Sequence, residues 1–516
     1  MATDQPLVVI GLDGATWRLL DKWIEAGALP NLGKIKSEGS CAPLESCLPP
    51  VTSPSWKCYS TGKNPGKLGV YWWEIVDVDN RKISIPDSRS FHSPELWDYL
   101  GDAGYNWATI NMPTTFPPHG ADNGGIMVAG PNTNPEKAYT SPPELKQTLE
   151  DQFDYKPIPD RSINQRGALK EIYHLIDTRF EVGKWLLETE DLDFLHLTTF
   201  LTNKLHHYFW DGPETKEGWK RVDQHLEWFI DREYNLLFLS DHGSNEIKTQ
   251  FQINAWLESE GYLQQSTEES LATQQGMKYG FTQEDLSRLA ARLNLRETAR
   301  SIVPDRLIDF LPKKSHKKGN KIDAIKWEAT QALASGQGLV YLTNPDATEA
   351  NAIREKIKSG LEELTDPRGH SVAKEVFTVE EVYTGDHLDL APDIIFDQAE
   401  GIHTEDHIGH HDVFEEPTGW RGENDRHGIF LAHGPSFSSK GKLPNPKITD
   451  VASTILHYMD VPVPADVDGS PIDVFTPGSR AAERELTYQD PRPTPSQLDQ
   501  NLQSTEERLR ELGYLN

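Results

Sequence analysis

Four apolar residues, Leu236–Leu239, run directly into Ser240-Asp241-His242-Gly243. A continuous apolar run that ends at turn residues is typical of a strand buried on both faces of a parallel sheet. Leu7–Leu12, which leads into Asp13-Gly14, has the same pattern. Similar runs predict further strands at Trp107–Asn111, Gly125–Ala129, Phe194–Phe200, Leu339–Leu342, Asp393–Phe396 and Ile429–Ala432.

Between several of these strands, apolar residues recur with helical spacing. The predicted helices are Thr16–Ala26, Pro30–Ile35, Leu169–Leu187, Glu349–Leu364 and Thr449–Tyr458. Alternation of strands and helices favours an α/β fold, in which helices flank a doubly wound, mostly parallel central sheet.

A chain of 516 residues is longer than a usual single core, so we expect a large α/β domain with an additional module. Residues 266–330 are polar and helix-favouring, with a basic cluster at 313–318, and we interpret them as an inserted helical cap or lid. A solvated helical decoration is the alternative. The core is then residues 1–265 and 331–480, and residues 481–516 form a tail whose amphipathic helix (498–512) docks on the body or on a partner.

The net charge of −29 disfavours binding to nucleic-acid polymers or to anionic membranes. A small phosphate ester remains compatible with it, because a divalent ion can invert the local field. No apolar run is long enough for a membrane span, and the N-terminal residues lack the features of a secretory signal. Three clustered cysteines without CxxC spacing are read as reduced thiols, so we expect a cytoplasmic protein. The oligomeric state is left open.

Asp13 and Asp241 each follow a predicted strand of the same sheet, and His242 is adjacent to Asp241. Ligands of open α/β sheets bind at the carboxyl ends of the strands, where carboxylates and an imidazole can converge on a divalent metal such as zinc or manganese. The alternative is that Asp241 caps a helix and His242 only packs. Thr52 precedes helix-start chemistry, which suits either a helix cap or an activated nucleophile at a helix N-terminus.

Five ordered segments together resemble the alkaline phosphatase superfamily, and most closely its type I phosphodiesterase/nucleotide pyrophosphatase branch. The segments are Gly11–Ala15, Pro30–Leu32, Pro50–Gly66, Ser240–Gly243 and Thr449–Gly469. The resemblance covers roughly residues 6–265 and 335–478 and implies an alkaline phosphatase-like fold with two metal sites beside a nucleophile.

In that resemblance the first metal site uses Asp13, Thr52, Asp241 and His242, and Thr52 is the nucleophile. The second site normally uses an aspartate, a histidine four residues later and a late histidine. His207 matches the first histidine, whereas Asn203 and Asn424 stand at the other two positions. An amide oxygen binds hard cations but holds zinc poorly. Because the second site lacks two of its usual ligands, we expect either one or two ions per chain. Zinc or manganese is the expected metal, with magnesium or calcium as alternatives.

Three interpretations of the altered second site stay open. The site is weak or empty, or it is rebuilt by neighbours, or the chain has changed to another transfer reaction or to binding alone. The neighbours considered are Asp425, His427, His206 and the histidine-rich segment His403–Asp412.

The leading hypothesis is a metal-dependent hydrolase of phosphodiesters or nucleotide-type pyrophosphates that forms a phosphoryl-threonine at Thr52. His207 would assist the leaving group or the water, and Asn203 would bind phosphate oxygens. Trp73, with its neighbour Trp72, would stack on a base or pack in the core. Two alternatives are a one-metal hydrolase or transferase for a phosphomonoester, sulfate ester or phosphonate, and a binding homologue without turnover.

Overall fold

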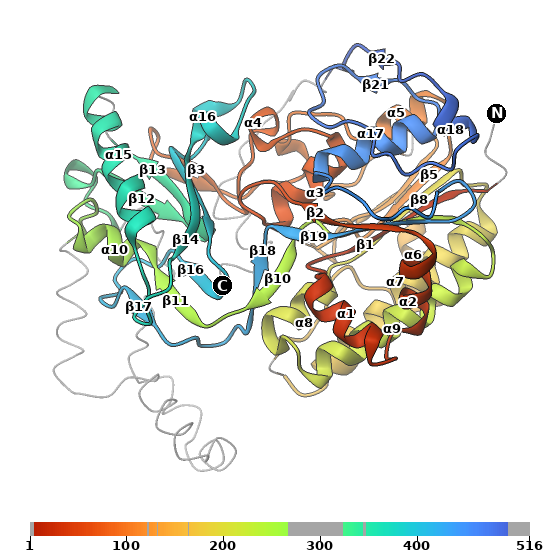
Figure 1. Ribbon diagram of the computed structural model, residues 1–516, viewed down its shortest axis with the longest axis horizontal. Helices are drawn as coiled ribbons and strands as arrows, with labels where there is room; N and C mark the ends of the chain where they lie inside the picture. The colour runs from red at the N-terminus through yellow and green to blue at the C-terminus, as the bar shows by residue number, and fades with distance from the viewer. Residues whose placement is uncertain are drawn as a thin grey trace.

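A computed structural model describes residues 5–120, 123–131, 133–163, 165–266, 324–343 and 347–493. Its largest element is a nine-stranded sheet in the order β20-β2-β19-β9-β1-β8-β5-β6-β7 (Figure 1). The strands are β20 (Gly441–Lys442), β2 (Ser40–Glu45), β19 (His427–His433), β9 (Asn235–Leu239), β1 (Leu7–Leu12), β8 (Phe194–Thr199), β5 (Trp107–Ile110), β6 (Gly125–Val128) and β7 (Thr140–Ser141). The five strands from β9 to β6 are parallel, and β19 and β7 run antiparallel to their inner neighbours. The predicted central sheet is confirmed.

Strand β1 lies in the middle of this sheet and is buried along its whole length. Because successive side chains of a strand point to opposite faces, its residues divide between two apolar clusters. Val8, Ile10 and Leu12 pack with one set of helices, and Leu7 and Val9 pack with the other. The first set comprises α1 (Trp17–Glu25), α2 (Pro30–Glu38), α7 (Ala168–Thr189) and α9 (Pro213–Ile230), and the second comprises α3 (Thr52–Thr61), α5 (Leu96–Asp102) and α17 (Ile448–Tyr458) (Figure 1).

A second lobe contains a four-stranded antiparallel sheet in the order β12-β13-β15-β14. Its elements are β12 (Ala332–Ser335), β13 (Leu339–Leu342), β15 (Ile394–Gln398) and β14 (Ala373–Thr378), with α15 (Ala347–Glu363) and α10 (Ile253–Ser259) beside them (Figure 1). The strands predicted at 339–342 and 393–396 therefore exist but belong to this sheet, not to the central one. A buried apolar run indicates a strand without indicating which sheet it joins.

Two small sheets join the lobes. β10 (Gly243–Glu246) pairs with β18 (Gly422–Asp425), and β11 (Thr249–Gln252) pairs with β16 (Ile402–Glu405) and β17 (Phe414–Glu415). The chain leaves the central sheet after β9, builds the second lobe, and returns through β18 to β19.

Most of the predicted cap, including the basic cluster, lies outside the described residues, as does the helix predicted at 498–512. The division into core, cap and tail stays a prediction. In the described part of the tail, β22 (Tyr488–Gln489) pairs with β21 (Val463–Pro464), and Arg492 contacts α5. No helix in the described ranges is long and apolar enough to cross a membrane.

Candidate active site

Asp13 and the Asp241-His242 pair lie at the carboxyl ends of two adjacent parallel strands. Gly11 of β1 is in register with Leu239 of β9, so the residues that follow the two strands meet at one edge of the sheet. All three side chains are fully buried. One ligand atom from each lies within 4.8 Å of those of the other two, and this is the one such group of three found in the described chain. The structure thus brings together three of the residues that the sequence singled out.

In each of these three side chains, a backbone or indole group outside the cluster engages one polar atom, and the other polar atom faces into the cluster. The Trp56 indole Nε1–H donates to Asp13 Oδ2 (2.8 Å), and the Gly14 N–H donates to Asp241 Oδ1 (3.3 Å). His242 Nδ1–H donates to the Gly243 carbonyl (2.8 Å), which leaves Nε2 with a lone pair. Asp13 Oδ1 and Asp241 Oδ2 have no hydrogen-bond partner in the described chain. They lie 3.7 and 3.3 Å from His242 Nε2.

The electrostatics of this cluster favour a cation. Burial and the neighbouring Asp241 charge raise the pKa of Asp13 well above its usual range, and burial also raises the pKa of Asp241. Among the described residues, the only ion-pair partner of either carboxylate is the His242 imidazole. Buried carboxylates without compensation are costly, and carboxylate oxygens with an imidazole nitrogen are ordinary ligands of divalent metals. The residues present therefore fit a metal ion.

Thr52 is the first residue of α3 and is almost fully buried. The cap position is taken by Val51, so the Thr52 hydroxyl does not have the capping role that was its alternative interpretation. Instead, the Thr52 hydroxyl donates to His242 Nε2 (3.2 Å), the ring nitrogen that carries no proton. The hydroxyl is therefore in contact with the Asp13–Asp241–His242 cluster and at a helix N-terminus, where developing negative charge is stabilised.

The candidate second site is built on α8 (Leu201–Phe209) and β18. His207 Nδ1–H donates to the Gly422 carbonyl (2.8 Å), its ring stacks on Trp420 with centroids 3.8 Å apart, and burial lowers its pKa to about 4. Asn203, one turn earlier on α8, and Asn424 on β18 are both buried, and the Oδ1 atom of each has no partner in the described chain. The Asn203 amide also lies next to Asp13 and lowers its pKa.

Three of the residues considered as replacement ligands, His206, His427 and Asp425, are engaged elsewhere or exposed. His206 has both nitrogens engaged, because Nδ1–H donates to the Gly14 carbonyl (3.0 Å) and Nε2 accepts from Trp219 Nε1 (2.8 Å). His427 is exposed at the start of β19. The Asp425 carboxylate accepts from the His427 N–H (3.2 Å) and faces Lys374 (3.8 Å).

The comparison with protein families assigns the chain to a family. The model described as type I phosphodiesterase / nucleotide pyrophosphatase matches residues 7–435. The chain belongs to this family. Its members are phosphoester hydrolases of the alkaline phosphatase superfamily, so the chain is an enzyme that acts on phosphoesters. A comparison with curated protein sequences finds no match.

Two solved structures show the same fold as this phosphodiesterase family member. Phosphonoacetate hydrolase from Sinorhizobium meliloti 1021, in complex with phosphonoacetate, has a TM-score of 0.56 and 14% sequence identity over 87% of this chain and 94% of that chain. Murine ectonucleotide pyrophosphatase/phosphodiesterase 5 has a TM-score of 0.51 and 14% identity over 92% of this chain and 100% of that chain. The alkaline phosphatase-like fold predicted from the sequence is confirmed.

Sequence reasoning missed a buried ionic group beside the second site of this family member. Glu423 is fully buried; it accepts from Gln337 Nε2 (2.5 Å) and the Asn424 N–H (2.7 Å) and forms an ion pair with His403. Although burial opposes the charge, Glu423 and Glu405 raise the pKa of His403 to about 10. Gln337 comes from the second lobe and His403 from β16, so both the second lobe and a joining sheet contact β18 next to His207. No sequence signal marks a buried glutamate within a polar stretch.

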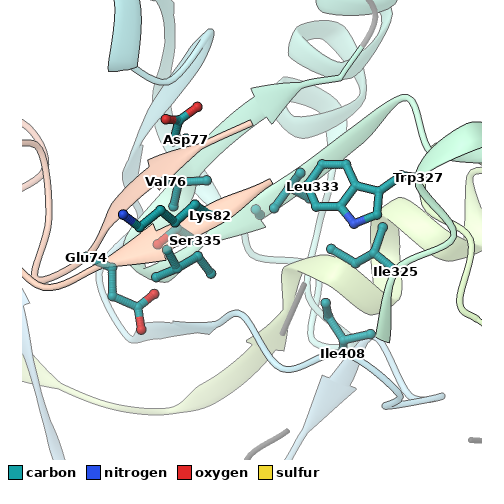
Figure 2. A pocket seen from close by; sticks show the side chains of 11 residues that line it. Glu74, Val76, Asp77, Lys82, Ile325, Trp327, Leu333, Ser335 and Ile408 are labelled. Atoms are coloured by element: carbon teal, nitrogen blue, oxygen red, sulfur yellow. The ribbon is translucent and has the colours of Figure 1, made fainter. Parts of the chain in front are cut away.

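The pocket in Figure 2 is distinct from this centre. It lies in the second lobe, where Trp327, Ile325, Leu333 and Ile408 form much of its wall. None of Asp13, Asp241 and His242 lines it. Trp73 is half-buried just before β3 (Ile75–Asp77), which borders this pocket, and Trp72 packs against Gly336. The position of Trp73 leaves its proposed role in substrate binding a prediction.

Proposed function

We propose that this phosphodiesterase family member is a metal-dependent hydrolase of phosphodiesters or nucleotide-type pyrophosphates with Thr52 as its nucleophile. The observation that carries the proposal is the position of Thr52 Oγ1, 3.2 Å from His242 Nε2 and beside two unpartnered, buried carboxylate oxygens. Asp13, Asp241, His242 and Thr52 would hold the ion. When bound, a divalent ion lowers the pKa of a nearby hydroxyl and offsets charge on phosphate oxygens.

The chain's own residues then divide the chemistry. The Thr52 hydroxyl gives up its proton to solvent as Oγ1 forms a bond to phosphorus. The bond to the leaving oxygen breaks, the leaving group departs as an alkoxide or aryloxide that takes a proton from water, and a phosphoryl-threonine results. A water molecule then attacks phosphorus and the bond between phosphorus and Thr52 Oγ1 breaks. The Thr52 oxygen takes up a proton from solvent to regenerate the hydroxyl, and the phosphate product is released. His207, neutral at pH 7 because burial lowers its pKa to about 4, accepts a proton from the incoming water. Asn203 and Asn424 donate hydrogen bonds to phosphate oxygens.

A panel of chromogenic esters tests this proposal. With Mn²⁺ or Zn²⁺ added, we expect bis-p-nitrophenyl phosphate to be hydrolysed with a higher kcat/KM than p-nitrophenyl phosphate or p-nitrophenyl sulfate. A nucleotide pyrophosphate should also be cleaved. Turnover of the monoester or the sulfate above that of the diester would overturn the diester assignment, and stabilisation by metal without any turnover would indicate a binding protein.

A specific observation supports a second candidate, a one-metal hydrolase or transferase for phosphomonoesters, sulfate esters or phosphonates. Carboxamides at Asn203 and Asn424 supply neither the charge nor the nitrogen donor of the family pattern, and His206 is fully engaged. Phosphonoacetate hydrolase shares the fold, which is compatible with this candidate without deciding the substrate. The ester panel separates the two candidates.

Metal content distinguishes one ion from two. We expect about one ion per chain in the wild type, because His207 lacks both partner ligands. The double variant Asn203→Asp/Asn424→His should bind a second ion, measured by elemental analysis after gentle purification and by calorimetric titration of the metal-free protein. Two tightly bound ions in the wild type would contradict the single-metal expectation.

A further inference from the structure

Trp56 lies between the nucleophile helix and the first metal ligand. It follows Thr52 by four residues on α3, so the two side chains lie one turn apart on the same face of the helix. The indole is fully buried, with edge-to-face contacts to Tyr59 and His196, both at centroid distances of 5.8 Å. A methyl group at Gly11 would approach its ring to 2.6 Å, which shows that the indole lies directly over β1.

The indole N–H selects which oxygen of Asp13 is left for a ligand. By donating to Oδ2 (2.8 Å), it leaves Oδ1 facing His242 Nε2 at 3.7 Å. The same hydrogen bond lowers the pKa of Asp13 against the opposing effects of burial and Asp241. Partners of this kind fix the orientation of metal ligands and tune their affinity.

We propose that Trp56 is a positioning residue that sets the metal affinity of the centre and keeps the Thr52 helix in register with Asp13. This inference rests on the metal centre of the proposed function. One side chain, anchored on the helix that starts with the nucleophile, reaches a carboxylate at the end of β1. A shift of α3 would therefore move the nucleophile and rotate the ligand together.

The test compares Trp56→Phe with Trp97→Phe. Trp97 is equally buried in the same apolar cluster, and its Nε1 has no hydrogen-bond partner in the described chain, so Trp97→Phe removes a similar volume without altering Asp13. Calorimetric titration of the metal-free proteins with MnCl₂ alone, and separately with ZnCl₂ alone, gives the affinities. We expect Trp56→Phe to bind about 10–100-fold more weakly and Trp97→Phe to bind like the wild type.

A shape-preserving variant provides a second readout, because a role in packing alone would leave the affinity for Mn²⁺ at the wild-type value when only the N–H is removed. If Trp56→Phe does not fold, incorporation of benzothienylalanine at position 56 keeps the bicyclic shape and removes only the N–H.

The outcomes separate this inference from the proposed function. Wild-type protein that binds neither metal would refute the metal centre and the role of Trp56 together. Wild-type protein that binds metal, with Trp56→Phe or the benzothienylalanine variant binding equally well, would refute the role of Trp56 alone. Equal weakening in Trp97→Phe would show a general packing effect and would also overturn the inference.

Discussion

Replacing Thr52 by alanine is expected to lower turnover of a phosphodiester by about 1,000-fold or more, because the attacking oxygen is removed. Three ligand side chains remain in Asp13, Asp241 and His242, so Mn²⁺ should still raise the melting temperature of the variant. Steady-state kinetics with bis-p-nitrophenyl phosphate, together with thermal unfolding with and without metal, measure both effects.

Two matched variants serve as controls for Thr52→Ala. Thr52→Ser keeps a hydroxyl and should retain measurable turnover and a trapped phosphoryl-enzyme on rapid acid quench. Ser53→Ala removes the next hydroxyl along α3, which is also buried and has no partner in the described chain, and should remain active. Undiminished turnover by Thr52→Ala would exclude Thr52 as the nucleophile.

Asp241→Asn should have opposite effects on stability and on activity. Because the pKa of Asp241 is raised in the folded protein, its ionisation opposes folding. The stability that the folded protein has while Asp241 is protonated is complete at pH values below the ordinary carboxyl pKa. This stability is lost as pH rises through the pKa of Asp241 in the folded protein. At neutral pH the metal-free variant should therefore be more stable than the metal-free wild type, by on the order of 1 kcal/mol.

The same variant should lose the stabilisation that metal gives to the wild type, and its turnover should fall about 1,000-fold. The new amide can donate to His242 Nε2, which lies 3.3 Å from Asp241 Oδ2, so the fold should be preserved. Thermal unfolding between pH 5 and 9, with and without Mn²⁺, measures both the stability of the metal-free variant and the stabilisation that metal gives it. Asp425→Asn is the control, since its carboxylate faces Lys374 rather than the centre. A metal-free Asp241→Asn less stable than the wild type would contradict the electrostatic argument.

The Asp13–Asp241–His242 cluster was predictable because a strong local pattern precedes its residues in the sequence. Buried apolar runs ending in Asp13 and in Asp241-His242 placed these residues at one sheet edge, and the structure has them there. The same reasoning could not place Leu339–Leu342, because a buried run indicates burial and not the partner strand. Parallel and antiparallel neighbours are chosen by contacts that are distant in sequence.

The second site, which contains His207, shows what residue spacing in the sequence cannot reveal. His206 and His207 are adjacent, and spacing alone does not reveal that Trp219 engages His206 while His207 stays against Trp420. Trp56 resembled an ordinary core residue, because its hydrogen bond to Asp13 depends on how α3 sits over β1. Such roles depend on tertiary packing and leave no periodic signal in the sequence.

The central position of β1 has a consequence for how the protein is made. Leu7 pairs with Phe194 on one side and with Asn235 on the other. At synthesis rates of about 5–20 residues per second, roughly 10–40 s pass before the first of these partners leaves the ribosome. Asp13 and Thr52 are thus exposed to the cell well before Asp241 and His242 exist. We therefore expect the cation to bind a finished sheet, and the nascent β1 to need protection by chaperones until its neighbours arrive.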